Sequence, residues 1–237
     1  MKPEAILFDL DDTILADDAV NEKAWGIVLE KPIPEARKLD IARLWAAIRQ
    51  AGDWYYGDPE RLRRARLDLR TARREVVTMA LSSIGVNDRR LARELADSYG
   101  EEKEKAIFVH PGAIETISHL WKEGIPMALL TNGNSERQRK KIERFELARF
   151  FDHILIEGEL GMGKPDEQIF RRALELLGVV HPSQTWMVGD GLETDVRPAQ
   201  KLGIYAIWVD WRGEGLPESS VVRPDRIIRR LCELLPT

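Results

Sequence analysis

An apolar run leads directly into three carboxylates in the segment Ile6-Leu7-Phe8-Asp9-Leu10-Asp11-Asp12-Thr13. Residues 5–8 are predicted to form a short buried strand, and acids that follow such a strand lie at the edge of a sheet where open α/β folds bind ligands. Asp9, Asp11 and Asp12 are close enough to raise one another's pKa unless a cation neutralises them, and a divalent metal with oxygen ligands is the simplest candidate. The alternative is an ordinary acidic loop, because Asp and Thr also form turns and cap helices.

The composition sets limits on the class of protein. The chain has 237 residues, of which 43% are hydrophobic and 32% charged, so it can bury a core without disulfides or structural zinc. A net charge of -4 argues against a nucleic-acid partner. The single cysteine, Cys232, fits a reducing compartment and is expected to lie in the core. With no signal peptide expected before the first strand and no membrane-spanning run, we expect a cytoplasmic protein without a membrane partner.

Helical patterns fill residues 17–105, in which no convincing strand is found. Helices are expected over residues 19–29, 34–50, 58–85 and 88–104. The third begins with Asp58 and Pro59, which suit a first helical turn. The region is therefore interpreted as a bundle of about four helices, inserted into an α/β protein.

Strands alternate with helices from His110 onward. The strands are expected over residues 127–130, 153–156, 186–188 and 205–209, and the helices over residues 112–123, 135–145, 167–177, 194–201 and 225–234. This alternation predicts a parallel sheet built from right-handed crossovers. The loop 211–222, rich in Gly, Glu and Ser, is expected to be a mobile surface segment.

Three later motifs follow predicted strands and should reach the same edge as Asp9. Thr131-Asn132-Gly133 can present donors to an anion, although a strand-to-helix turn with Ser135 as its cap would read the same way. In Gly163-Lys164-Pro165, the lysine can neutralise a phosphate and an attacking carboxylate, or be merely solvated.

The last of the three motifs runs from Gly189-Asp190 to Asp195. Asp190 can complete a metal site with Asp9, and Asp195 can hold Lys164 or a metal-bound water. Asp195 could equally be an acid that favours the start of a helix. The convergence of all these motifs at one edge is the reason to expect a site there.

Taken together, and in this order, the four motifs resemble those of the haloacid dehalogenase (HAD) superfamily of hydrolases. The resemblance implies a Rossmann-like α/β core with a parallel sheet over residues 1–15 and 106–237, and a helical cap domain over residues 16–105. Phosphatases acting on small molecules are the members most similar in pattern. The implied function is that of a Mg²⁺-dependent phosphatase that hydrolyses a phosphate monoester through an aspartyl-phosphate intermediate.

The resemblance also implies roles for the acids. Asp9 would attack phosphorus, and Asp11 would protonate the leaving alcohol and then deprotonate the hydrolytic water. Mg²⁺ would be held by the carboxylates of Asp9 and Asp190 and by the backbone carbonyl of Asp11. Asp12 is given no chemical role, and Thr13 is expected to fix the turn.

Two further motifs would serve the phosphate. Thr131 and Lys164 would hold its oxygens, with Asn132 on the substrate side and Asp195 supporting Lys164. The expected partner is a small phosphorylated metabolite. Nucleotides, sugar phosphates, acylneuraminate phosphates and phosphoglycolate are all compatible with the sequence, which indicates no oligomeric state.

Other functions remain open from the sequence alone. A phosphomutase would use the same residues, whereas a haloacid dehalogenase has no leaving alcohol for Asp11 to protonate. A non-catalytic module regulated by phosphate, such as a receiver domain, has a different motif order and lacks a large helical insertion. Steady turnover of a phosphate monoester would separate an enzyme from such a module.

Two features of the insertion could contact a substrate. Trp54-Tyr55-Tyr56 is expected in a loop, where the rings could stack on a base or sugar or else join the core of the cap. Arg63, Arg66, Arg70 and Arg74 would share one helix face, where they could reach an anion or pair with acids. The tryptophans Trp25, Trp45, Trp121, Trp186 and Trp208 are interpreted as packing residues.

Overall fold

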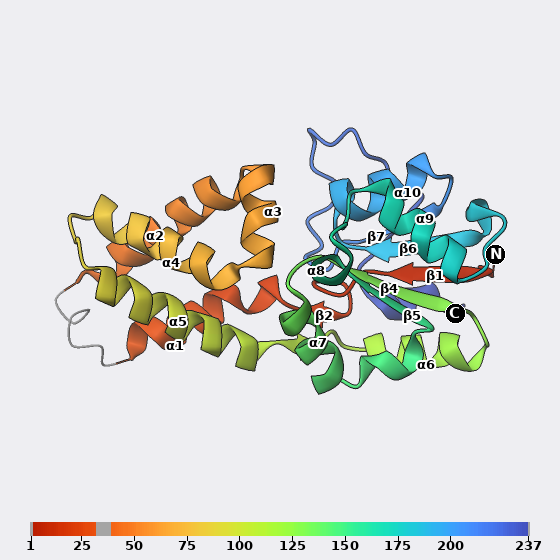
Figure 1. Ribbon diagram of the computed structural model, residues 1–237, viewed down its shortest axis with the longest axis horizontal. Coiled ribbons are helices and arrows are strands. Elements are labelled where there is room, and N and C mark those ends of the chain that lie inside the picture. The colour runs from red at the N-terminus through yellow and green to blue at the C-terminus, as the bar shows by residue number, and fades with distance from the viewer. Residues whose placement is uncertain (1, 32–38, 237) are drawn as a thin grey trace. The chain divides into compact units, whose positions relative to one another are not determined.

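The computed structural model describes residues 2–31 and 39–236, and the chain divides into two compact units (Figure 1). One unit, here called the core unit, consists of Met1–Asp18 and Phe108–Thr237. The other, here called the inserted unit, is Ala19–Ile107. In the part of the chain that the structure describes, no helix is long and apolar enough to cross a membrane.

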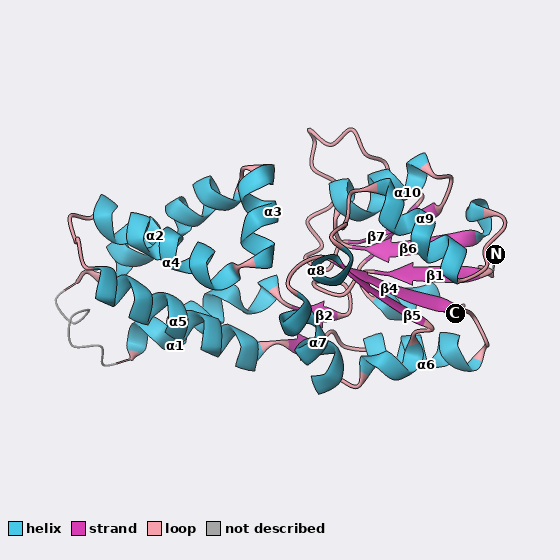
Figure 2. Cartoon of the chain, viewed as in Figure 1, coloured by secondary structure: helices cyan, strands magenta, loops and turns pink. Residues whose placement is uncertain are grey.

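Within the part of the core unit that the structure describes, a six-stranded sheet forms the centre (Figure 2). Its strand order is β5-β4-β1-β6-β7-β8, and every neighbouring pair is parallel. The strands are β1 Ala5–Phe8, β4 Met127–Thr131, β5 His153–Ile156, β6 Thr185–Gly189, β7 Tyr205–Val209 and β8 Arg226–Ile228. The predicted parallel α/β core is therefore confirmed.

Helices cover both faces of this sheet. They are α6 Ala113–Lys122, α7 Ser135–Arg144, α8 Glu157–Leu160, α9 Glu167–Leu176 and α10 Arg197–Lys201. Side chains such as Leu7 and Met187 pack with Phe170 of α9 and Ala199 of α10 in one apolar cluster. Figure 1 shows α6 on the opposite face from α9 and α10. Because a parallel sheet must be covered on both faces, the central strands β1 and β4 are buried throughout and are apolar except for Thr131 at the end of β4.

Short elements complete the core unit. They are β2 Leu15–Ala16, β3 Phe108–Val109, the 3₁₀-helices η3 Leu147–Phe150, η4 Pro182–Gln184 and η6 Leu231–Leu234, and the π-helical turn η5 Leu192–Val196. β2 and β3 form an antiparallel ribbon in which Leu15 pairs with Val109. The sequence patterns did not predict this ribbon, because two-residue strands have no periodicity.

The expected helix over residues 225–234 is wrong. Its first part is the strand β8, which pairs with β7 and buries Ile228. The Asp225 carboxylate accepts a hydrogen bond from the backbone N–H of Ala206, which fixes the start of that pairing. The second part is η6, which turns Leu231 and Leu234 inward and leaves Cys232 exposed, so the expected core position of the cysteine is also wrong.

The inserted unit contains five α-helices among its described residues, after a 3₁₀ turn, η1 Asp18–Val20. They are α1 Asn21–Glu30, α2 Ile41–Tyr56, α3 Pro59–Leu67, α4 Leu69–Ser83 and α5 Arg89–Ala106. The unit has an apolar core of its own, to which Leu44, Val77 and Leu95 contribute. Within that core Trp25 stacks on Tyr99 with ring centroids 4.3 Å apart. That this unit acts as a cap stays a prediction.

Two expected helices have other boundaries. The single helix predicted over residues 58–85 is broken at Asp68, whose carboxylate accepts from the N–H of Thr71 and so starts α4. The helix predicted over residues 34–50 begins at Ile41, after the N-cap Asp40, and continues to Tyr56. Residues 34–38 of that prediction lie outside the described residues.

The aromatic and basic features of the inserted unit have mixed outcomes. Trp54-Tyr55-Tyr56 lies in α2 and not in a loop, and Tyr55 and Tyr56 pack against the unit's core while Trp54 is 57% exposed. Arg70 and Arg74 of α4 both pair with Asp97 of α5, at 3.0 and 2.5 Å. In the core unit, Trp121 packs edge-on against Phe150, with ring centroids 6.3 Å apart, although it is 52% exposed.

Candidate active site

The acidic segment and its predicted partners meet at the carboxyl ends of three adjacent strands. β1 lies between β4 and β6, with Phe8 in register with Leu129 and Val188. After β5 the chain returns to the other side of β1, so the ends of these strands form the switch point where open α/β sheets bind ligands. Asp9 follows β1, Thr131 ends β4, and Asp190 follows β6.

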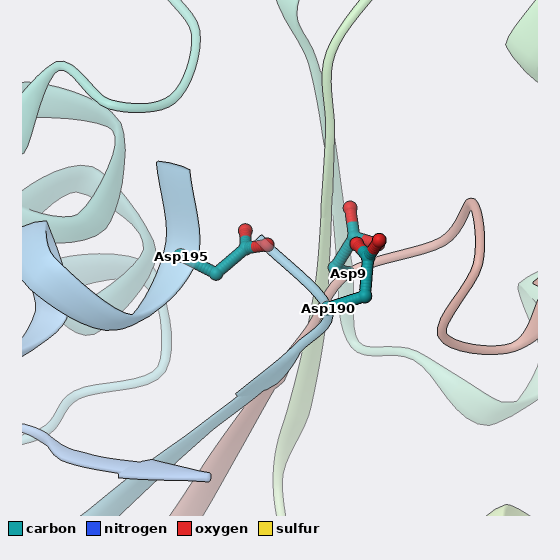
Figure 3. Close-up of side chains that lie close together, drawn as sticks. All are labelled: Asp9, Asp190 and Asp195. Atoms are coloured by element: carbon teal, nitrogen blue, oxygen red, sulfur yellow. The ribbon is translucent and has the colours of Figure 1, made fainter. Parts of the chain in front are cut away.

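Three carboxylates gather at this point. One carboxylate oxygen from each of Asp9, Asp190 and Asp195 lies within 4.8 Å of the corresponding oxygens of the other two residues. Figure 3 shows the carboxylates of Asp9 and Asp190 side by side, with that of Asp195 directed toward them from its helical turn. Burial and the charge of Asp195 raise the pKa of Asp9 to about 7, although Lys164 opposes the rise. Burial and the charge of Asp9 likewise raise the pKa of Asp190.

The buried Lys164 lies between two of these acids. Its Nζ donates to Asp9 Oδ1 and lies 2.6 Å from Asp195 Oδ1, and the residue is only 4% exposed. Burial alone would lower the pKa of Lys164, but the charges of Asp195 and Asp9 outweigh it and raise that pKa. The lysine is therefore a fixed cation beside Asp9.

Asn132 holds the backbone around Lys164. Its Nδ2 donates to the carbonyl of Lys164 at 2.6 Å, and its Oδ1 accepts from the N–H of Lys164 at 2.8 Å. Gly163 makes this approach possible, because a Cβ there would lie 2.7 Å from Asn132 Oδ1 and 2.8 Å from Glu157. The next peptide bond, Lys164–Pro165, is cis. The side chain of Asn132 thus serves Lys164 in this structure, and its predicted contact with substrate stays a prediction.

Asp195 is positioned by the loop that precedes it. Its Oδ2 accepts from the N–H of Gly191 at 2.8 Å, and the residue is 1% exposed. At Gly189, a Cβ would lie 2.6 Å from the Asp195 carboxyl carbon, so a glycine is required for this packing. Because one oxygen of Asp195 contacts Lys164 and the other accepts from Gly191, both oxygens are already used to position the lysine and the loop that contains Gly191.

Asp11 lies outside this cluster of three and contacts helix α7. Lys141 Nζ lies 2.6 Å from Asp11 Oδ1, and Gln138 Nε2 donates to Asp11 Oδ2 at 2.9 Å. The same amide nitrogen donates to Thr131 Oγ1 at 2.5 Å. One helix therefore contacts both the predicted proton donor and the predicted phosphate ligand.

Asp12 shapes the loop that follows. It has a left-handed backbone with φ of 60° and is 6% exposed. Its carboxylate accepts from the N–H groups of Asp17 and Asp18 at 2.9–3.1 Å. Burial and the neighbouring charge of Asp18 raise the pKa of Asp12 to about 7. The hydroxyl of Thr13 is buried and has no hydrogen-bond partner in residues 2–31 or 39–236, so the side-chain bonds that fix the turn come from Asp12.

The donor set fits a hard divalent cation. Asp9 Oδ2 is buried and accepts no hydrogen bond from the described residues, and the Asp190 carboxylate lies beside it. One lysine faces three acids here, which leaves an excess of negative charge that a cation would neutralise. Carboxylate oxygens are the ligands that Mg²⁺ prefers. Asp9 and Asp190 are the residues best placed to hold it, since Asp195 is already bound.

Two polar residues of α7 and two acids near the site are not predicted from the sequence. Gln138 and Lys141 are 1% and 3% exposed, and Asp17 and Glu157 are also buried. Glu157 accepts from the N–H of Gly133 at 3.0 Å. The position of α7 directly after β4 was the one available signal. A helix in which most residues are charged shows no apolar stripe, so nothing in its pattern marked the buried face.

An open parallel α/β fold with a cluster of acids and a buried lysine at its switch point defines a Rossmann-like hydrolase core. The chain belongs to the haloacid dehalogenase-like hydrolase family, whose model matches residues 3–203. It is 34% identical to the phosphoserine phosphatase of Thermus thermophilus, covering 97% of this chain and 96% of that protein.

The chain is also similar to a second phosphatase in sequence and to a solved structure in fold. The chain is 30% identical to the glyceraldehyde 3-phosphate phosphatase of Pyrococcus furiosus, over 86% of this chain and 80% of that protein. Its fold matches a magnesium-bound crystal structure of the HAD-hydrolase YfnB from Bacillus subtilis with a TM-score of 0.74. That match is 23% identical and covers 99% of this chain and 97% of that chain, so it concerns the fold.

Proposed function

We propose that this protein is a Mg²⁺-dependent phosphatase that hydrolyses a small-molecule phosphate monoester through an aspartyl-phosphate on Asp9. The main support is the buried Lys164, which contacts Asp9 at the point where Asp190 and Asp195 also converge. Phosphoryl transfer needs a nucleophile, neutralisation of charge and a proton donor, and this cluster with Asp11 offers all three. Family membership and two relatives named as phosphatases support the same reaction.

The first half-reaction transfers the phosphoryl group to the enzyme. A carboxylate oxygen of Asp9 forms a bond to phosphorus while the bond from phosphorus to the alcohol oxygen breaks. Asp11 gives its proton to that leaving oxygen. Lys164 and the hydroxyl of Thr131 bind the phosphate oxygens, and Lys164 keeps Asp9 oriented for attack in line with the leaving group.

The second half-reaction releases phosphate. Asp11, now a carboxylate, takes a proton from a water molecule whose oxygen attacks phosphorus. The bond between phosphorus and the Asp9 oxygen breaks. This regenerates the free Asp9 carboxylate and releases inorganic phosphate. Mg²⁺, held by the carboxylates of Asp9 and Asp190 and by the backbone carbonyl of Asp11, would neutralise the charge of the phosphate and the acids.

The substrate is proposed to be a small phosphorylated metabolite. The relatives named above differ in the compound that they dephosphorylate, so identity to them does not select one. As a cap, the inserted unit would exclude water and select the substrate. Within it, Trp54 is an exposed aromatic surface, with the Arg61 guanidinium 3.9 Å from its ring centroid. The cytoplasmic location stays a prediction.

The test is phosphate release from a panel of phosphorylated metabolites, with and without Mg²⁺, by the wild type and by Asp9→Asn and Asp11→Asn. We expect turnover that requires Mg²⁺ and falls by at least about 100-fold in either variant. Acid-quenched wild-type enzyme should carry a covalent phosphate that Asp9→Asn lacks. Near wild-type turnover by Asp9→Asn would exclude it as the nucleophile.

The same assay separates the other functions. A phosphomutase would return an isomeric sugar phosphate in place of free phosphate, and a haloacid dehalogenase would release halide from a haloacid. A regulatory module would show no sustained turnover of any phosphate monoester.

A further inference from the structure

Helix α7 carries a buried polar face that the reaction as proposed does not use. Most of its side chains are charged and solvated, yet Gln138 and Lys141 are almost fully buried. A buried ammonium group is costly unless it is paired, and Lys141 is paired twice, with Asp11 and with Asp17 at 2.6 Å each. Arg137, from the same helix, pairs with Asp17 at 2.7 Å.

The Asp11 carboxylate is held at both of its oxygens. Lys141 contacts Oδ1 and Gln138 donates to Oδ2, so the carboxylate plane cannot rotate without breaking one of the two contacts. Each oxygen that accepts one hydrogen bond keeps a second lone pair, which leaves room for a transferred proton. Asp9 lacks such a hold, because its Oδ2 has no hydrogen-bond partner in the described part of the chain.

Gln138 links Asp11 to Thr131. Its amide nitrogen has two hydrogens and donates to both residues. Since the Thr131 oxygen accepts from Gln138, its own hydroxyl hydrogen is available to an anion. The amide thus fixes the distance between the proposed proton donor and one proposed phosphate ligand.

We propose that Lys141 and Gln138 are positioning residues, which orient the Asp11 carboxyl for proton transfer to the leaving oxygen. This inference rests on the proposed phosphatase function. Lys141 keeps its proton throughout and acts only through Asp11. Gln138 acts through both Asp11 and Thr131, so its loss also weakens the binding of phosphate.

The alternative is that the buried pairs of α7 only stabilise the fold. Substrates with different leaving groups distinguish a role in positioning Asp11 from a role in stabilising the fold alone. An alkyl phosphate releases an alkoxide, which needs a proton as the bond to phosphorus breaks, whereas 4-nitrophenyl phosphate releases a phenolate that is stable without one. A defect in positioning Asp11 therefore lowers kcat/KM for the alkyl ester selectively, because kcat/KM reports the steps up to departure of the leaving group. Hydrolysis of the aspartyl-phosphate, in which Asp11 acts as the base, comes later and is common to both esters. A general structural defect lowers kcat/KM for both esters equally.

The experiment compares Lys141→Met and Gln138→Met with wild type, using 4-nitrophenyl phosphate and the best alkyl phosphate from the metabolite panel, both with Mg²⁺. For Lys141→Met we expect kcat/KM on the alkyl ester to fall about 10- to 100-fold and kcat/KM on the aryl ester to fall less than about 3-fold. Gln138→Met should show the same selectivity, with a further and equal loss of kcat/KM on both esters because phosphate binds more weakly. Lys141→Arg should recover most of the loss.

Lys140→Met is the matched control, because Lys140 is exposed on the same helix and pairs with Glu136. It should retain the wild-type ratio of the two rates. In the Asp11→Asn background, Lys141→Met should cause no further loss, since its effect is exerted through Asp11.

Three results would overturn the inference. They are equal losses on the two esters, no loss in either variant, and an additive loss in the double variant. If wild type hydrolyses neither ester, the proposed function fails and the inference fails with it, whereas active wild type with unselective variants refutes the positioning role alone.

Discussion

Asp9, Asp11 and Asp12 lie within four positions of one another, yet their carboxylates meet three different environments. Asp9 faces Lys164, Asp11 faces α7, and Asp12 accepts from two backbone N–H groups of its own loop. A strand alternates its side chains, but the turn after it does not, so each acid leaves the backbone in its own direction. The different roles proposed for the three acids therefore follow from these surroundings and not from the residue type.

The contacts of Asp12 predict how tolerant this position is. Asp12→Asn keeps an oxygen acceptor, suits a left-handed backbone and removes a carboxyl whose pKa is raised by folding, so it should not destabilise the protein. Asp12→Ala removes the acceptor for the buried N–H of Asp17 and the partly buried N–H of Asp18, and should destabilise the protein by about 2–3 kcal/mol. Urea unfolding of both variants checks this. Equal destabilisation by Asn and Ala would show that the carboxylate charge, rather than the acceptor oxygen, is what the loop requires.

The raised pKa of Asp190 predicts a pH-dependent effect in protein freed of metal with EDTA. Because folding raises this pKa above 3.8, the folded protein holds the proton more tightly than the unfolded chain does. That stabilisation is complete below pH 3.8 and is lost as the pH rises toward the folded value. Asp190→Asn stays neutral, so it should match wild type near pH 4 and exceed its Tm at pH 8, by about 2–4 °C per kcal/mol of repulsion removed.

The measurement is a thermal melt of both proteins between pH 4 and 8. The stabilisation by Asn should increase steadily with pH. A wild type that is more stable than Asp190→Asn at pH 8 without metal would contradict this account of the acidic cluster.

At the scale of elements, α4 and α5 are joined by Arg70 and Arg74 on Asp97. The hydrogen bond from Arg74, and a weaker one from Arg70, lower the pKa of Asp97 from 3.8 to about 2. The ion pairs therefore stabilise the folded state fully above pH 3.8, and this contribution is lost as the pH falls toward 2. Since Asp97 is partly exposed, the expected contribution is about 1 kcal/mol.

Asp97→Asn should accordingly unfold at lower urea than wild type at pH 6, with the difference shrinking below pH 4. Glu94→Gln, a neutralisation of an exposed acid on the same helix, serves as the control and should have little effect at either pH. A difference for Asp97→Asn that stays constant from pH 6 to pH 3 would argue against the ion pairs as its cause.

Elements with a strong pattern were predictable, and those that depend on distant partners were not. The strands β1, β4, β5, β6 and β7 are apolar runs bounded by polar turns, so their positions follow from the sequence. β8 contains two isoleucines between charged residues, and only its pairing with β7 makes it a strand. The break at Asp68 was missed because an aspartate inside a helical pattern and an aspartate that caps the next helix look alike.

The same distinction holds for the candidate site. Asp9, Thr131, Lys164 and Asp190 could be proposed because each follows a strand in a parallel sheet. Lys141 and Gln138 could not, since their burial depends on how α7 lies against the loop after β1. A sequence shows where side chains leave the backbone, whereas their partners depend on the folded chain.

At the scale of the whole molecule, each unit has an apolar core of its own, so the two are expected to unfold as separate transitions in calorimetry. Mg²⁺ should raise the transition of the core unit, by RT ln(1 + [Mg²⁺]/Kd), and leave that of the inserted unit unchanged. Asp190→Asn should abolish this rise. An equal shift of both transitions, or a shift that persists in Asp190→Asn, would contradict the proposed metal site.

The ribbon of β2 and β3 has an evolutionary consequence. Leu15 pairs with Val109 and Ala16 with Phe108, so the segments by which the chain leaves and re-enters the core unit run side by side. Residues between these two paired segments can be lengthened, shortened or replaced without changing the order of the sheet or the spacing of the acids. The ribbon therefore allows the inserted unit to be replaced as one piece. Under the proposed function, in which this unit selects the substrate, such a replacement would change the substrate and keep the acids that carry out the reaction.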